Sequence, residues 1–103
     1  MAKFLVTYHG GGEPPADPAM RDQMMAAFGA WAASVGDNLI DPGAPLGPAQ
    51  AVTSDGVHDD ETRSVEGYTL LSADSLADAV ELVRGHPFVS RGGTLRVSES
   101  VAP

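Results

Sequence analysis

Residues 67–87, GYTLLSADSLADAVELVRGHP, constrain the fold more than any other stretch, because a strand pattern leads directly into a helix pattern. The segment YTLL at 68–71 is aromatic, β-branched or aliphatic, which favours a pleated strand. Successive side chains of a strand point to opposite faces, and both faces of this one are largely apolar. Such a pattern indicates a central strand with a neighbour on either side.

The second half of this stretch carries the start and stop signals of an amphipathic helix. The candidate N-caps are Asp74 and Ser75, and Asp78 stands three residues after Ser75 in a capping-box position. Gly85 predicts that the helix ends in a left-handed backbone conformation, and Pro87 prevents the helix from continuing. The apolar positions recur with the spacing of one helical face: Leu76, Ala79, Val80 and Val83.

Three further strands and one long helix are predicted from the rest of the chain. Residues 3–8 alternate as a first strand, 49–53 form a weak strand, and 94–98 form the last strand. Asp17, followed by a proline, begins a helix that ends at Gly36. The apolar stripe of this helix, which we expect to face the core, is Met20, Met24, Ala27, Phe28, Trp31 and Val35.

The remaining segments are irregular or polar. Residues 38–48 mix strand and loop, and their prolines and glycines suit the edge of a sheet. Residues 54–64 are polar and acidic, so we expect a hairpin loop there. Residues 13–16 predict a stiff surface loop with two prolines, and residues 100–103 a tail. The outer side of the long helix is small and uncharged, which would let another surface approach closely: Ala26, Gly29, Ala30, Ala33 and Ser34.

The predicted order is β-α-β-β-β-α-β within a single domain of residues 1–103. Strand–helix–strand occurs twice, which is typical of the ferredoxin-like sandwich among α+β folds. That fold has an antiparallel sheet with two helices on one face. Two helices leave the other face of the sheet uncovered, and this is a physical reason to expect a partner there.

Composition narrows the classes of partner. A net charge of −8 argues against nucleic acid and against anionic membrane surfaces. The chain has no cysteine, which excludes disulfides, thiol nucleophiles and thiolate metal sites. No run approaches the ~18 apolar residues of a membrane span, and the first residues lack a signal-peptide pattern. We therefore expect a cytoplasmic protein with no nucleic-acid or membrane partner.

A series of short motifs runs through residues 67–94. They are Gly67-Tyr68, Ala73-Asp74-Ser75-Leu76, Ala79, His86-Pro87-Phe88-Val89 and Gly92-Gly93-Thr94. This half of the chain resembles the second half of the YCII-related proteins, a superfamily that includes the DGPF-type proteins. Asp41-Pro42-Gly43 and Gly47-Pro48 fit the same pattern more loosely. Asp55-Gly56 matches the start of the DGPF signature, but Val57-His58 replaces its Pro-Phe.

The resemblance implies a homodimer whose two sheets pack face to face as a dimeric α+β barrel. It also implies lyase-like acid–base chemistry with a histidine and an aspartate, a small-molecule substrate, and neither a metal nor a bound cofactor. The usual catalytic histidine of that superfamily lies early in the first helix. Residues 18–35 contain no histidine, so this chain departs from the superfamily at that position.

His9, Asp41 and Tyr68 are the candidate catalytic residues. His9 ends a strand beside three glycines, whose backbone can approach a ligand closely. Asp41 sits at an irregular strand end and would pair with it, and Tyr68 would donate a hydrogen bond from the sheet. The ordinary interpretations are a surface histidine and a turn aspartate. The glycines belong neither to an esterase loop nor to a dinucleotide site, because no G-x-S-x-G elbow exists and Pro15 replaces the last glycine.

The candidate ligand-binding residues are Trp31, Phe28, Met24 and His86. The three helix residues are first of all core residues, although an adaptable Met and a Trp over a sheet can border a cavity. For His86 the ordinary interpretation is a C-terminal cap of the second helix, where it favours the helix dipole. The acidic residues within 55–61 lack calcium-loop spacing and read as a solvated loop.

Two functions therefore remain open. One is a lyase- or isomerase-type enzyme that uses His9 and Asp41 in a barrel cleft. The alternative is a non-catalytic small-ligand-binding or accessory homodimer, which the missing helix histidine favours. An enzyme requires a titratable pair that converges in a pocket, whereas a binder requires only an apolar cavity.

Overall fold

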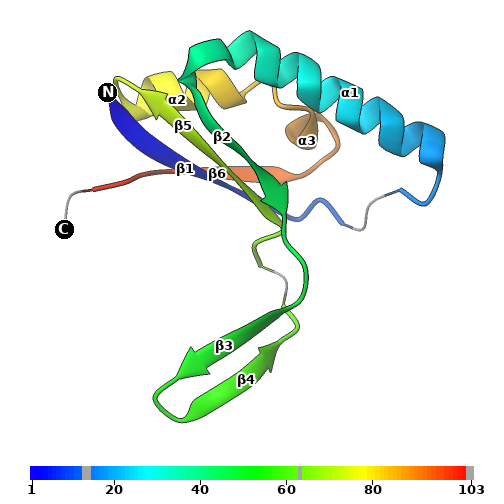
Figure 1. Ribbon diagram of the computed structural model, residues 1–103, viewed down its shortest axis with the longest axis vertical. Helices are drawn as coiled ribbons and strands as arrows, with labels where there is room; N and C mark the ends of the chain where they lie inside the picture. The colour runs from blue at the N-terminus through cyan, green and yellow to red at the C-terminus, as the bar shows by residue number, and fades with distance from the viewer. Residues whose placement is uncertain (13–14, 63, 102–103) are drawn as a thin grey trace.

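The computed structural model describes residues 1–12, 15–62 and 64–101 and is an α+β protein built on a four-stranded sheet (Figure 1). The strands are β1 (Ala2–His9), β2 (Leu39–Pro45), β5 (Gly67–Ala73) and β6 (Thr94–Glu99). They lie in the order β2-β5-β1-β6, and every neighbouring pair is antiparallel. β5 has a neighbour on each side, as its apolar faces predict.

All the helices lie on one side of this sheet (Figure 1). They are α1 (Pro18–Val35), α2 (Leu76–Val83) and the short α3 (Pro87–Ser90), with a 3-10 turn at Gly36–Asn38. The predicted caps are confirmed: the Asp17 carboxylate accepts the Ala19 N–H, and the Ser75 hydroxyl accepts the Asp78 N–H. Gly85 does not take the positive φ expected of a helix stop; α2 ends at Val83, and Arg84 is its C-cap.

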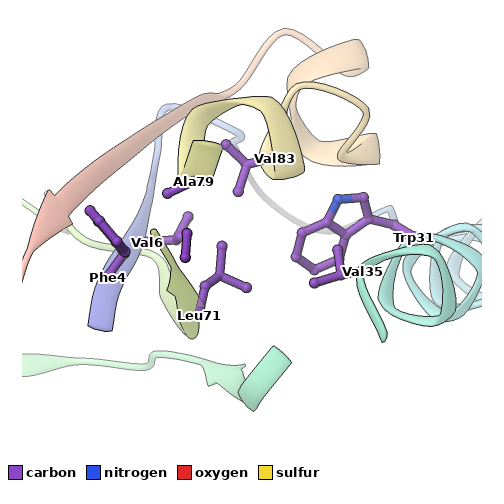
Figure 2. Packing of buried hydrophobic residues seen from close by; sticks show 8 residues of the cluster. Phe4, Val6, Trp31, Val35, Leu71, Ala79 and Val83 are labelled. Atoms are coloured by element: carbon purple, nitrogen blue, oxygen red, sulfur yellow. The ribbon is translucent and has the colours of Figure 1, made fainter. Parts of the chain in front are cut away.

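The core lies between the sheet and the helices (Figure 2). It contains Phe4, Val6, Trp31, Val35, Leu71, Ala73, Ala79 and Val83. The stripe expected to bury α1 is only partly buried, which corrects the sequence prediction. Trp31 and Val35, near the end of α1, are buried, but Met20 near its start is 51 % exposed. An apolar period predicts which residues of a helix share a face, but not how much of its length meets the sheet.

The burial of β1 and β5 alternates and defines a second, uncovered face of the sheet. Phe4 and Val6 point toward the helices and are fully buried, whereas Leu5 between them is 41 % exposed. Because no helix covers that side, we call it the open face. It carries Lys3, Leu5, Thr7 and His9 of β1, and Tyr68, Leu70 and Ser72 of β5. Arg96 of β6 lies opposite Thr7 and belongs to the same face.

The acidic stretch expected as a loop over 54–64 contains a strand, which is a further correction. β3 (Ala49–Thr53) pairs with β4 (Gly56–Asp60) as a separate two-stranded hairpin. The sequence of β4, GVHDD, has little strand propensity, so its pairing was not predicted. The described part of the chain therefore contains six strands, in place of the five of the predicted order. Parts of the loop expected at 13–16, of the 54–64 stretch and of the 100–103 tail lie outside the described residues.

β2 is an edge strand with two register shifts, as its prolines and glycine predict. Gly43 has a φ of +76°, and a Cβ there would stand 1.7 Å from the Tyr68 carbonyl oxygen. Only glycine therefore allows β2 to approach β5 at this point.

Candidate functional site

The three candidate catalytic residues lie on the open face of the sheet. His9 follows Leu5 and Thr7 on the same side of β1. Tyr68 is opposite Thr7, and Asp41 of β2 is opposite Leu70. The opposite face of the sheet holds the core, so the sheet separates the three candidate catalytic residues from the helices.

The strand register does not bring His9 and Asp41 together. Leu70 of the central strand β5 is paired with Leu5 of β1 on one edge and with Asp41 of β2 on the other edge. Asp41 is thus level with Leu5, which places it about 13 Å from His9 along the strands and about 10 Å across them. His9 instead contacts Thr7 Oγ1 through Nε2, at 2.7 Å, and the Ser64 carbonyl through Nδ1.

The Asp41 carboxylate accepts the Gly43 N–H at 2.8 Å. This is the ordinary turn role of an aspartate, in which the side chain bonds the backbone two residues on.

The candidate ligand-binding residues, in contrast, converge between α1 and the sheet. His86 is 3 % exposed, and its ring centroid lies 4.4 Å from that of Trp31 and 5.6 Å from that of Phe28. Met24, one turn before Phe28, is half-buried. Tyr8 completes the group, at 5.1 Å from the His86 ring. We call Tyr8, Phe28, Trp31 and His86 the aromatic cluster.

A directed chain of hydrogen bonds runs through the aromatic cluster. The Phe88 N–H, which can only donate, lies 3.0 Å from His86 Nδ1, so that nitrogen accepts. Nε2 then carries the proton and donates to the Tyr8 hydroxyl at 2.8 Å. Tyr8 donates to Thr69 Oγ1 at 2.6 Å, and Thr69 donates to the Pro42 carbonyl at 2.9 Å. Each donor has its acceptor, and the geometry fixes His86 as the neutral Nε2–H tautomer.

The electrostatics of the cluster follow from its burial. Burial lowers the pKa of His86 to about 4, because a buried imidazolium loses its hydration. Burial also raises the pKa of Tyr8, and the hydrogen bond to Thr69 partly opposes that rise. At neutral pH the cluster therefore holds no charge, and both ionisable groups act only as hydrogen-bonding partners.

The segment after α2 holds His86 in place. His86 is the N-cap of α3 rather than the predicted C-terminal cap of α2, and Pro87 occupies the first turn of α3. The Phe88 ring packs between two glycines: a Cβ on Gly11 would lie 2.4 Å from it, and one on Gly93 would lie 2.2 Å from it. Of the three glycines after His9, Gly11 thus serves close packing against Phe88.

Sequence reasoning missed Tyr8 as the partner of His86 and Thr69 as the partner of Tyr8. Tyr8 lies 61 residues from Thr69 and 78 residues from His86 in the chain, so no local pattern reports these contacts. A signal was nevertheless present, since each is a polar residue on the apolar face of a central strand. Buried polar groups of this kind almost always have a hydrogen-bond partner.

Trp31 also lines a groove of about 590 Å³. α1 contributes Ala27, Ala30, Trp31, Ser34 and Val35, while the chain from α2 to α3 contributes Glu81, Leu82, Gly85, Pro87 and Ser90. Trp31 Nε1 donates to the Leu82 carbonyl at 2.9 Å and so fixes the indole across the end of α2. Trp31 therefore forms a wall of the groove with one part of its ring and packs against His86 with another.

Within residues 1–12, 15–62 and 64–101, no group of three or more His, Asp or Glu side chains is placed to hold a metal ion. None of the helices in these ranges combines the length and the apolar character needed to cross a membrane. No protein-family model matches the chain, and no curated protein matches its sequence.

Proposed function

We propose that the chain is a YCII-related protein with a ferredoxin-like fold that acts as a homodimer and binds a small apolar or aromatic molecule in the groove beside Trp31. The observation that carries this proposal is the groove itself. Its volume of about 590 Å³ falls within the ~300–1,000 Å³ of small-molecule sites. Trp31, a candidate ligand-binding residue, forms one of its walls.

The sheet supports the ferredoxin-like part of the proposal. β1 and β5, which lie four strands apart in chain order, are neighbours at its centre, and each precedes a helix on the same side. The open face supports the homodimer, because an antiparallel sheet with apolar residues on both faces is stable when both are covered. Leu5, on this face, is 41 % exposed in the single chain.

We propose binding rather than acid–base catalysis because His9 and Asp41 lie far apart on the sheet. A proton-transferring pair must lie within hydrogen-bond reach of its substrate and of each other. The candidate acid–base residues and the groove lie on opposite sides of the sheet, so they do not share a substrate in one chain. His86 is close to the groove, but Trp31 stands between them and both His86 nitrogens already have partners.

Titration of the 15N-labelled protein with indole and with phenol tests the groove as the ligand site. Trp31 is the only tryptophan, so its indole N–H signal is assigned without ambiguity. We expect that signal and the Leu82 and Ser90 amides to shift together and to saturate. Shifts confined to other parts of the chain would contradict the proposal.

A matched pair of variants on α1 sharpens this test. Ala30→Leu places a larger side chain in the groove and should abolish saturable binding. Ala33→Leu makes the same change at an exposed position of the same helix that does not line the groove, and it should leave binding within about twofold. Equal binding by both variants would place the ligand elsewhere.

A further inference from the structure

The β3–β4 hairpin stands away from the rest of the molecule. Its two strands pair with each other, and among the described strands neither joins the four-stranded sheet. Figure 1 shows it projecting on the side of the sheet opposite to the helices, which is the side of the open face. An isolated two-stranded hairpin is marginally stable in water. A hairpin in this position is therefore expected to gain stability from something that lies under the open face.

One face of the hairpin carries an exposed valine pair near its tip, beside the polar pair Gln50 and Asp59. Val52 and Val57 are directly opposite each other and are 79 % and 60 % exposed. Cross-strand pairs of β-branched residues stabilise a sheet chiefly by packing against further apolar surface. Among the residues that the structure describes, no apolar surface covers these two valines.

We propose that the hairpin is an arm that clasps a second copy of this chain, with Val52 and Val57 packed against that copy. This inference rests on the proposed homodimer and adds the element that reaches across it. Stacked sheets lie about 10 Å apart, and a five-residue strand spans about 17 Å. A hairpin that projects from one sheet therefore reaches past the plane of a sheet packed on its open face.

Charge complementarity identifies the second copy as the partner. Residues 55–61 carry four carboxylates and neither Lys nor Arg. The open face, which the second copy turns toward the approaching hairpin, carries two cations, Lys3 and Arg96, against one carboxylate, Asp41. A net charge of −8 makes two copies repel each other overall, so placing the acidic arm near these cations reduces the repulsion where the copies meet.

Sedimentation equilibrium of a Val52→Thr/Val57→Thr double variant tests the arm. Threonine keeps the shape and strand propensity of valine but adds a hydroxyl, so the hairpin is retained while its apolar contact is lost. We expect the dimer dissociation constant to rise at least about tenfold. Met25→Gln is the control, because Met25 is 74 % exposed on α1, on the helical side of the sheet, and its loss should change that constant less than about twofold.

Hydrogen exchange of the hairpin amides gives a second readout that needs no substitution. The amides of β3 and β4 should be protected at protein concentrations where the dimer forms and should exchange faster on dilution. A wild-type dimer with unchanged affinity in the double variant, and with hairpin exchange independent of concentration, would overturn the arm and leave the homodimer standing. A wild-type chain that stays monomeric at all concentrations would overturn the homodimer and the arm together.

Discussion

His86 occupies a place where a charged imidazole would have no partner. Aromatic rings surround it, one ring nitrogen accepts the Phe88 N–H, and the other donates to Tyr8. Protonation of Nδ1 would turn two donors toward each other, and burial removes the water that would otherwise stabilise the cation. The histidine is a neutral structural group that ties α3 to β1 and, through Thr69, to β2.

The lowered pKa of His86 predicts a loss of stability in acid. The unfolded histidine binds a proton near pH 6.5 and the folded one near pH 4, so the unfolded state binds more protons between these values. The stabilisation is complete above about pH 6.5 and falls as the pH drops through that window. We expect the free energy of unfolding to decrease by about 3 kcal/mol from pH 7 to pH 4 on account of this group.

Urea unfolding of the wild type and of His86→Gln across this pH range measures the effect. Glutamine does not titrate and keeps a donor for Tyr8, so its stability should depend less on pH. The difference between the two pH profiles isolates His86 from the carboxylates, which both proteins share. Parallel profiles for the two proteins would show that His86 is not held neutral by the fold.

At the scale of single elements, the loop after β1 and the segment after α2 are joined by close packing of glycine against Phe88. The Gly11 N–H also donates to Glu66 Oε2 at 2.9 Å, which ties the same loop to the start of β5. Both contacts place the end of β1, and with it Tyr8, beneath His86. The position of the aromatic cluster thus depends on Gly11, which does not line the groove.

Gly11→Ala should destabilise the protein by about 1–3 kcal/mol, because the added methyl group overlaps the Phe88 ring. Gly29→Ala is the matched control: it lies within α1, has open space around it, and should stabilise the protein by about 0.5–1 kcal/mol through helix propensity. Thermal unfolding monitored by circular dichroism compares the two. Equal effects of the two substitutions would rule out the close packing of this loop.

Local chemistry explains which elements could be predicted from the sequence. Asp17 and Ser75 begin their helices through caps that a short window reveals, and the two largely apolar faces of β5 predict its central place. β4 could not be predicted, because GVHDD pairs only through the register of its partner strand.

The aromatic cluster was predictable in part. Phe28, Trp31 and His86 were candidates on residue type alone, but their meeting with Tyr8 depends on contacts far apart in the chain. The acid–base pairing of His9 with Asp41 depended on the register of β1, β5 and β2. That register sets the two residues apart, and residue type carries no information about it.

At the scale of the whole molecule, the chain is less compact than its length requires. Its radius of gyration is 15.0 Å, against about 13 Å for a compact domain of this size. The helices cover one side of the sheet, and the hairpin projects on the other side, where the open face lies (Figure 1). A second copy on the open face would cover Leu5 and would give the hairpin a surface to pack on.

A matched pair of leucine substitutions tests whether the open face is an interface. Leu5→Glu on the open face and Leu76→Glu on α2 change the same residue type at similar exposure, 41 % and 47 %. Both alter the net charge equally, and neither position is buried within one chain. A carboxylate buried in an interface without a partner is strongly destabilising, whereas one on a solvated helix is not.

Sedimentation equilibrium of these two variants beside the wild type is the most direct measurement of the proposed homodimer. We expect the wild type and Leu76→Glu to have twice the mass of one chain and Leu5→Glu to have the mass of one chain. A monomeric wild type, or a Leu5→Glu variant that dimerises as well as Leu76→Glu, would contradict the assignment of the open face as the dimer interface.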